Sequence, residues 1–190
     1  MSTNKELPTR AGVVIVGGGV TGVATAYELA AAGVPDVLLI ERDQLGSGST
    51  CKAAGGVRAQ FSDEVNIALG ARSLETFQSF GRRFGQEIDL HQVGYLSLLD
   101  SPDDVAAFER NVSLQNDMGV PSRMISVEEA QRLSPLISHE GLLAAVYSPT
   151  DGHCTPESVV QGYATAARRH GARLLTGCTA QGIEVVDGEI

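Results

Sequence analysis

The N-terminal part of the chain alternates between apolar runs and glycine-rich breaks, which predicts a strand, a helix and a second strand in succession. Residues 12–16 form a β-branched run without alternation, typical of a strand buried on both faces. Across residues 20–32 small side chains recur every three or four positions, which favours a helix packed closely on a strand, and Gly33 ends it as a C-cap. Residues 37–40 form the second strand. The pattern predicts a right-handed parallel crossover.

The pattern changes in the middle of the chain. A helix is predicted to start near Ser62, and the residues on its apolar side are Ile67, Leu74, Phe77, Phe80 and Phe84. Residues 94–99 alternate as a sheet strand, and Ser101 caps a second helix. Ser126 with Glu129 forms a capping box for a third, and residues 141–147 form another strand. These elements predict a small α+β insertion.

The last part of the chain returns to the initial pattern. A helix opens at Thr155 and ends at Gly171, and residues 173–175 and 183–186 are predicted strands. Residues 187–190 predict an Asp-Gly hairpin turn and a returning strand. The fold class is therefore expected to be α/β, a Rossmann-like domain with a parallel sheet that the α+β insertion interrupts.

Composition narrows the functional classes. The 190 residues are 43% hydrophobic and 19% charged, as in a globular protein, and the formal net charge of -9 argues against nucleic acid as a partner. Cys51, Cys154 and Cys178 are too far apart for a zinc site, and their odd number fits a reducing cytoplasm. No metal site is predicted. The chain starts without a signal peptide pattern, and the apolar stretch 12–40 contains glycine and proline breaks, so no membrane span is expected.

A glycine motif lies between the first strand and the first helix. Gly17-x-Gly19-x-x-Gly22 provides a tight turn, close approach of the backbone to a pyrophosphate, and close helix packing. The helix begins at the two residues inside the motif, Val20 and Thr21, where amide groups and the helix dipole favour a diphosphate. The residues after the second strand are Glu41 and Arg42. Glu41 lies nineteen residues after Gly22, at the position that binds the adenosine ribose. We therefore predict a dinucleotide cofactor.

The following loop distinguishes FAD from NAD. Small residues predicted to lie along the pyrophosphate, the ribityl chain and the flavin ring are Gly48, Ser49, Thr50, Gly55 and Gly56. A nicotinamide dinucleotide would not require this second contact region. The alternative is a flexible surface loop. The sequence predicts FAD.

One cation stands out after this loop. Arg58 could hold a substrate carboxylate or stabilise an anionic reduced flavin, and the alternative is a structural ion pair at the surface. Lys52 is a weaker candidate because a loop lysine is more often solvent-exposed. No catalytic triad is visible, which agrees with chemistry carried by a flavin.

Several stretches resemble one family of flavoenzymes. The fingerprint VVIVGGGVTGVATAYELAAAG, the strand end LLIER, the loop GSGSTCKAAGGVRAQF, and the later VGYLSLL, GVPSRMISVEEAQRLSP and SPTDGHCTPESV are similar to FAD enzymes of the D-amino-acid oxidase type. The likeness is greatest to the β subunit of heteromeric sarcosine oxidases and to L-proline dehydrogenases. It implies oxidation of a small amino acid or N-methylated amine, with hydride transfer to flavin N5. The other functions left open are a single-chain glycine or D-amino-acid oxidase and a non-catalytic flavin-binding module for electron relay.

The resemblance also implies partners and further positions. It implies other subunits of a hetero-oligomer, and adenine contacts for the backbone at Thr179 and Ala180. Relatives attach a second flavin, FMN, through a histidine in the turn near His153, but the local register places that histidine opposite Pro156, and Cys51 is expected to be a small packed cysteine rather than a flavin link.

The expected domains follow from the resemblance. Residues 1–84 are the first part of the FAD-binding domain, residues 85–150 a partial substrate domain, and residues 151–190 the returning part of the FAD-binding domain. Relatives continue further, so we expect the chain to be an N-terminal part that does not catalyse turnover alone.

Overall fold

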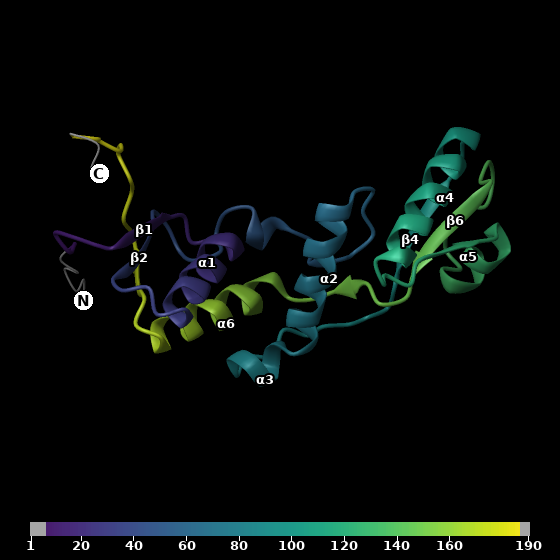
Figure 1. Ribbon diagram of the computed structural model, residues 1–190. Coiled ribbons are helices and arrows are strands. Elements are labelled where there is room, and N and C mark those ends of the chain that lie inside the picture. The colour runs from purple at the N-terminus through teal and green to yellow at the C-terminus, as the bar shows by residue number, and fades with distance from the viewer. Residues whose placement is uncertain (1–6, 187–190) are drawn as a thin grey trace. The chain divides into compact units, whose positions relative to one another are not determined.

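The computed structural model describes residues 7–186 and has an α/β fold with a parallel sheet (Figure 1). The chain divides into two compact units, each described separately below. The first unit comprises the chain up to Ala54, Phe80–Ile88 and the chain from Thr155, and the second comprises Gly55–Ser79 and Asp89–Cys154. The division into an FAD-binding domain and a substrate domain stays a prediction.

The first unit contains a three-stranded parallel sheet. Its strands are β1 (Val13–Val16), β2 (Val37–Glu41) and β8 (Arg173–Thr176), in the order β1-β2-β8. Leu39 pairs with Ile15 on one side and with Leu174 on the other. The predicted crossover from β1 to β2 and the strand at 173–175 are therefore confirmed.

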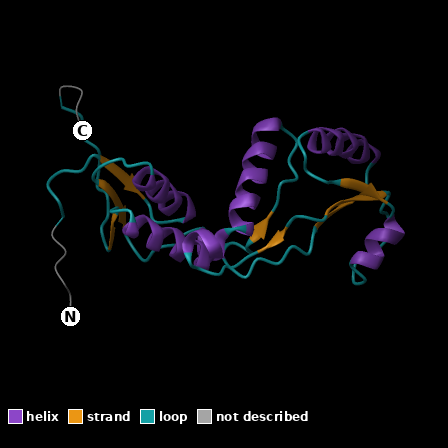
Figure 2. Ribbon diagram, turned by 60° about the horizontal axis from the view of Figure 1, so that its bottom comes forward, coloured by secondary structure: helices purple, strands orange, loops and turns teal. Residues whose placement is uncertain are grey.

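Two long helices of this unit pack against each other, α1 (Val20–Ala31) and α6 (Pro156–Arg169). Ala26 of α1 and Ala164 and Ala167 of α6 are fully buried, and such small side chains let two helix backbones approach closely. In Figures 1 and 2 the two helices lie side by side next to the sheet. The sequence predicted close packing of α1 on a strand, and its packing against α6 was not predicted.

An aromatic cluster completes the core of the first unit. The short helix α3 (Phe80–Phe84) contributes both of its phenylalanines, whose rings lie 4.4 Å apart between centroids. The ring of Tyr163 lies 4.8 Å from Phe84, and Tyr27 lies 5.0 Å from Phe84 in an edge-on arrangement. Gly162 is required there because a Cβ would collide with the Phe80 ring. The cluster anchors Phe80–Ile88 to this unit.

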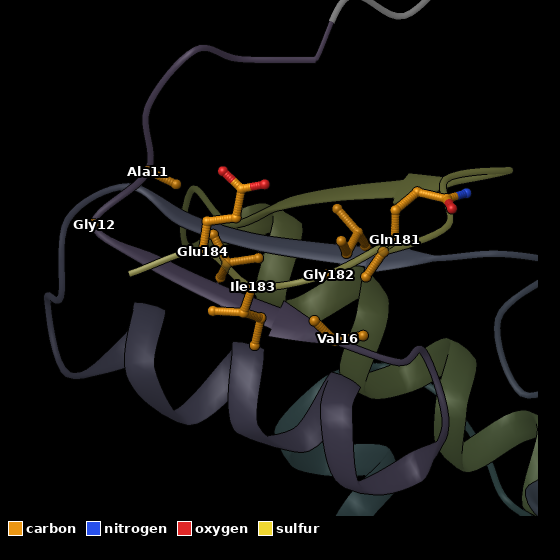
Figure 3. A pocket seen from close by; sticks show the side chains of 10 residues that line it. Ala11, Gly12, Val16, Gln181, Gly182, Ile183 and Glu184 are labelled. Carbon is orange, nitrogen blue, oxygen red and sulfur yellow. The ribbon is translucent and has the colours of Figure 1, made fainter. Parts of the chain in front are cut away.

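One face of the parallel sheet is open. The expectation that β1 is buried on both faces was wrong, because Val14 is 52% exposed and Val16 is 61% exposed. Both point to the same side of the strand, since side chains alternate across a sheet. Figure 3 shows the helices on the other side of the sheet. The uninterrupted β-branched run therefore does not mean that both faces are covered.

The second unit is an α+β layer. Its antiparallel sheet has the order β4-β6-β5, and a separate two-stranded ladder joins β3 to β7. Helices α4 and α5 begin at the predicted caps, where the hydroxyls of Ser101 and Ser126 accept hydrogen bonds from backbone N–H groups. The elements of this unit are β3 (Gly56–Val57), α2 (Glu64–Gln78), β4 (Tyr95–Leu99), α4 (Pro102–Asp117), β5 (Arg123–Ile125), α5 (Val127–Leu133), β6 (Ala144–Ser148) and β7 (Gly152–His153).

Two expectations about secondary structure were wrong, and four elements were missed. The single helix expected from Ser62 through Phe84 is two helices, since α2 ends at Gln78 with Ser79 as its C-cap and α3 begins at Phe80. The sequence did not predict β3, β5, β7 or the short 3₁₀ helix η1 (Thr50–Lys52). Residues 183–186 do not form a strand. The expected hairpin at 187–190 lies outside the described residues.

Candidate functional site

The glycine motif forms a tight turn between β1 and α1. Gly17 has a φ of 107°, a conformation that favours glycine, and its N–H donates to the Ile40 carbonyl at 2.9 Å. A Cβ at Gly22 would collide with the Gly17 carbonyl oxygen, and a Cβ at Gly19 would lie 3.3 Å from Thr50 Oγ1. Gly17 is thus required by its backbone conformation, and Gly19 and Gly22 by the close approach of neighbouring protein atoms. The turn has the tight geometry of the dinucleotide-binding motif.

Glu41 lies at the carboxyl end of β2, next to this turn. Its Oε2 accepts the Gly18 N–H at 2.6 Å, and its Oε1 accepts the Asp43 N–H at 2.8 Å. The hydrogen bonds from Asp43 and then Gly18 lower the pKa of Glu41. A carboxylate has about four lone-pair positions, so Glu41 keeps capacity for ribose hydroxyl donors. Glu41 is thus fixed in its charged form at the predicted ribose position.

The loop after β2 is ordered against the turn. The Gly46 N–H donates to the Gly18 carbonyl at 2.9 Å, and Thr50 Oγ1 accepts the Val20 N–H at 3.1 Å. Thr50 is buried, and its hydroxyl oxygen is the acceptor for an amide at the start of α1. Gly46 and Thr50 are thus buried and bonded to the turn, whereas residues 47–49 and 51–54 of the same loop are exposed. The structure brings Thr50 to the glycine turn, as the FAD prediction requires.

The other predicted residues of this unit are more peripheral. Val20 and Thr21 form the first turn of α1, whereas Gly48 and Ser49 are exposed in the loop. Arg42 is exposed and pairs with Asp43 at 3.3 Å. A surface pair of this kind contributes little energy, so Arg42 remains able to reach a ligand.

Two loop residues also have defined surroundings. Lys52 is exposed, as expected for a loop lysine. The expectation of a packed Cys51 was wrong, because the residue is exposed. Desolvation, with Glu157 as hydrogen-bond partner and negative charge, raises the pKa of Cys51, which disfavours its reactive thiolate.

A pocket of about 810 Å³ lies on the open face of the sheet (Figure 3). Its lining includes Val14 and Val16 of β1, Ile40 of β2, and Ala180, the predicted adenine contact. The Cys178 N–H donates to the Glu41 carbonyl at 2.9 Å, which holds the segment after β8 against the end of β2. Ala180 thus lines a largely apolar pocket on the sheet that carries Glu41.

Three predicted residues belong to the second unit. Gly55 is buried and has a φ of 77°, and Gly56 lies in β3. The guanidinium carbon of Arg58 lies 5.4 Å from the ring centroid of Phe61 and 5.6 Å from that of Tyr95. Arg58 is exposed, and no described carboxylate forms an ion pair with it. The choice between a ligand-binding role and a structural role for Arg58 stays a prediction.

The sequence analysis missed one polar residue of this unit. Asp151 is fully buried, and its Oδ1 accepts the Ala59 N–H at 3.1 Å. Its Asp-Gly position after a strand resembles an ordinary exposed turn, so the sequence gave no sign of burial. Among residues 7–186, no helix is long and apolar enough to cross a membrane. Within the same range, no three histidine, cysteine or acidic residues are grouped to hold a metal ion.

Comparison with known proteins agrees with this geometry. The family model described as "FAD dependent oxidoreductase" (DAO) matches residues 12–190. Rat mitochondrial dimethylglycine dehydrogenase is 35% identical over 89% of the chain and 20% of its own length, and human mitochondrial sarcosine dehydrogenase is 32% identical over 96% and 20%. The crystal structure of L-proline dehydrogenase from P. horikoshii has a TM-score of 0.87 and 37% identity, over 95% of this chain and 48% of that one. The chain spans about a fifth of the curated relatives' length.

Proposed function

The chain belongs to the DAO family of FAD dependent oxidoreductases, and we propose that it serves the oxidation of a small amino acid or N-methylated amine. The observation that carries this proposal is the glycine turn with Glu41 and Thr50 fixed beside it. The substrate class is supported by the similarity to dimethylglycine, sarcosine and L-proline dehydrogenases. FAD, when bound, supplies the acceptor for a hydride that leaves the carbon beside the substrate nitrogen.

The residues of this chain bind and orient in this proposal. The Thr21 amide in the first turn of α1 holds the diphosphate, and Glu41 holds the adenosine ribose. The Val20 N–H next to it donates to Thr50 Oγ1 and so ties the loop after β2 to this end of the helix. Gly18 and Asp43 keep the carboxylate of Glu41 charged and aimed at the end of the sheet. The open pocket with Ala180 offers an apolar wall for the adenine.

Arg58 is proposed to hold the carboxylate of the substrate. Its guanidinium is exposed, stacked on Phe61 and Tyr95, and without an ion pair among the described residues. Stacking limits the motion of the side chain, and the planar fork of an arginine matches a carboxylate. Amino acids and N-methylated glycines all carry this group, whereas simple amines do not.

We also propose that the chain acts as a β-type subunit with partner chains. The proposal rests on the resemblance of the sequence to β subunits of sarcosine oxidases. Purification of the full-length protein from its own cells, followed by measurement of its mass in solution, tests it. A monomer with full activity would favour a single-chain oxidase instead. Cytoplasmic localisation stays a prediction.

Anaerobic reduction of the full-length protein tests the proposed reaction. We expect a yellow protein that releases FAD on denaturation and loses its visible flavin absorbance with at least one of dimethylglycine, sarcosine, L-proline, glycine or D-alanine. Matched amines without a carboxylate, such as dimethylamine and pyrrolidine, should react far more slowly. Absence of bleaching with every compound would contradict the proposal and favour a flavin-binding module. A colourless protein that binds NADH would contradict the cofactor itself.

A further inference from the structure

A buried carboxylate lies near Arg58 in the second unit. Asp151 is 0% exposed, which is rare for aspartate unless the carboxylate is fully paired. Its Oδ1 accepts the Ala59 N–H, across 92 positions of sequence, whereas its Oδ2 has no hydrogen-bond partner among the described residues. A buried, incompletely paired carboxylate is costly, so its presence requires a physical reason.

The register of the β3–β7 ladder supplies that reason. Val57 pairs with Gly152, so Arg58 and Asp151 face each other one step further along, where the ladder has ended. There the Asp151 side chain takes over as acceptor for the next available backbone amide, Ala59. The direction of the chain as it leaves Arg58 is therefore fixed by a carboxylate rather than by a strand partner.

The turn that carries Asp151 is itself held in place. The Gly94 N–H donates to the Asp151 carbonyl at 2.9 Å, and the Gln92 side chain donates to the Thr150 carbonyl at 2.6 Å. A Cβ at Gly152 would collide with the His91 carbonyl oxygen. A carboxylate on such a rigid turn can transmit its own position to the segment that it binds.

We propose that Asp151 is a positioning residue for Arg58: it fixes the backbone one residue beyond Arg58 and so holds the guanidinium over Phe61 and Tyr95. The effect of Asp151 on substrate binding rests on the proposed function, in which Arg58 binds the substrate carboxylate. Burial raises the pKa of Asp151, and the hydrogen bond from the Ala59 N–H and the charge of Arg58 oppose that rise. The positive charge of Arg58 thus favours the ionised acceptor.

The reactivity of Arg58 tests the proposal without any need for turnover. In the full-length, FAD-loaded protein, modification of Arg58 by phenylglyoxal is followed by peptide mass and compared with the exposed Arg110 as an internal reference. We expect Asp151→Ala to accelerate modification of Arg58 about three- to tenfold, as loss of one hydrogen bond predicts. Asp151→Asn keeps an acceptor but loses the charge, so we expect it to accelerate modification of Arg58 about twofold. Exposed Asp100→Asn is the control and should change nothing.

Carboxylate binding provides the second readout. The apparent Kd of a carboxylate ligand such as dimethylglycine is measured from its effect on flavin absorbance. Asp151→Ala should raise this Kd about three- to tenfold in the native background and have no further effect in an Arg58→Gln background. An effect that persists in the Arg58→Gln background would show a general structural role and overturn the proposal.

The outcomes separate the two ideas. Asp151→Ala could accelerate the modification of Arg58 but leave carboxylate binding unchanged, with Arg58→Gln also leaving binding unchanged. That result would support positioning by Asp151 and overturn the proposed role of Arg58. An unchanged relative reactivity of Arg58 in Asp151→Ala would overturn the positioning role. If that variant does not fold, an unchanged reactivity in Asp151→Asn overturns it instead.

Discussion

The glycine turn and the Arg58 segment are both predicted binding regions, but the molecule fixes them in different ways. In the turn, hydrogen bonds join Gly18 to Glu41 and Val20 to Thr50, over 23 and 30 positions of sequence. The Arg58 segment depends on Asp151, whose contact spans 92 positions. The turn is thus built by one crossover unit, whereas the Arg58 segment depends on a distant turn. The first kind of site can be read from a sequence motif, and the second requires the fold.

The largest expected effect is at the turn itself. Gly22→Val should abolish FAD retention, because the new side chain collides with the Gly17 carbonyl. Overpacking of about 3 kcal/mol corresponds to a loss of affinity of roughly a hundredfold. Exposed Thr25→Ala, one turn further along the same helix, is the control and should retain FAD. The measurement is the ratio of bound flavin to protein after gel filtration, and normal retention in Gly22→Val would refute the assignment of the turn.

A smaller effect is expected from the carboxylate next to the turn. Glu41→Gln should weaken FAD binding about tenfold, since hydrogen bonds to a charged acceptor are stronger than those to a neutral one. The native pKa of Glu41 is lowered, so its stabilising contribution is complete above the ordinary value of about 4.3 and is lost as pH falls through the lowered pKa. As the pH is lowered from about 6 to about 3, the fraction of FAD released should therefore rise steeply at the acid end in the native protein and less steeply in Glu41→Gln. Equal profiles would argue against a role for the Glu41 charge.

The smallest effect is expected in the Arg58 segment. Tyr95→Leu removes one of the two rings beneath the guanidinium, and an exposed cation–π contact contributes about 0.5–1 kcal/mol. The Kd of a carboxylate ligand should therefore rise about two- to fivefold. In an Arg58→Gln background the same change should have no effect. A rise that is equal in both backgrounds would mean that Tyr95 contacts the ligand by itself, and the contrast between the two regions would then weaken.

Much of the fold follows from local sequence patterns. The crossover from β1 to β2, the cap of α4 at Ser101 and the capping box at Ser126 were predicted because each depends on residues a few positions apart. The cofactor prediction succeeded for the same reason, since the glycine turn and Glu41 belong to one short unit. The family match confirms FAD as the cofactor type.

The features that were missed or wrongly predicted depend on contacts between residues far apart in the sequence. β3 and β7 are two residues long, and each exists only because the other pairs with it across the chain. The exposure of Val16 could not be inferred from its β-branched neighbours, because coverage of a sheet face depends on other elements. Asp151 was missed because nothing in an Asp-Gly turn indicates that the fold buries its side chain.

The placement of β8 has a consequence for how the protein is made. β8 pairs with β2, so Leu38 acquires Arg173 as a neighbour only after the whole intervening α+β unit has been synthesised. Until then the edge of β2 is unpaired on a nascent chain, and the aromatic cluster lacks Tyr163 of α6. Topologies with such long-range pairing fold slowly and are vulnerable to aggregation in the meantime. Early completion of the glycine turn during translation therefore leaves the edge of β2 unpaired, and chaperones that shield strand edges should have their greatest effect on this protein before β8 emerges from the ribosome.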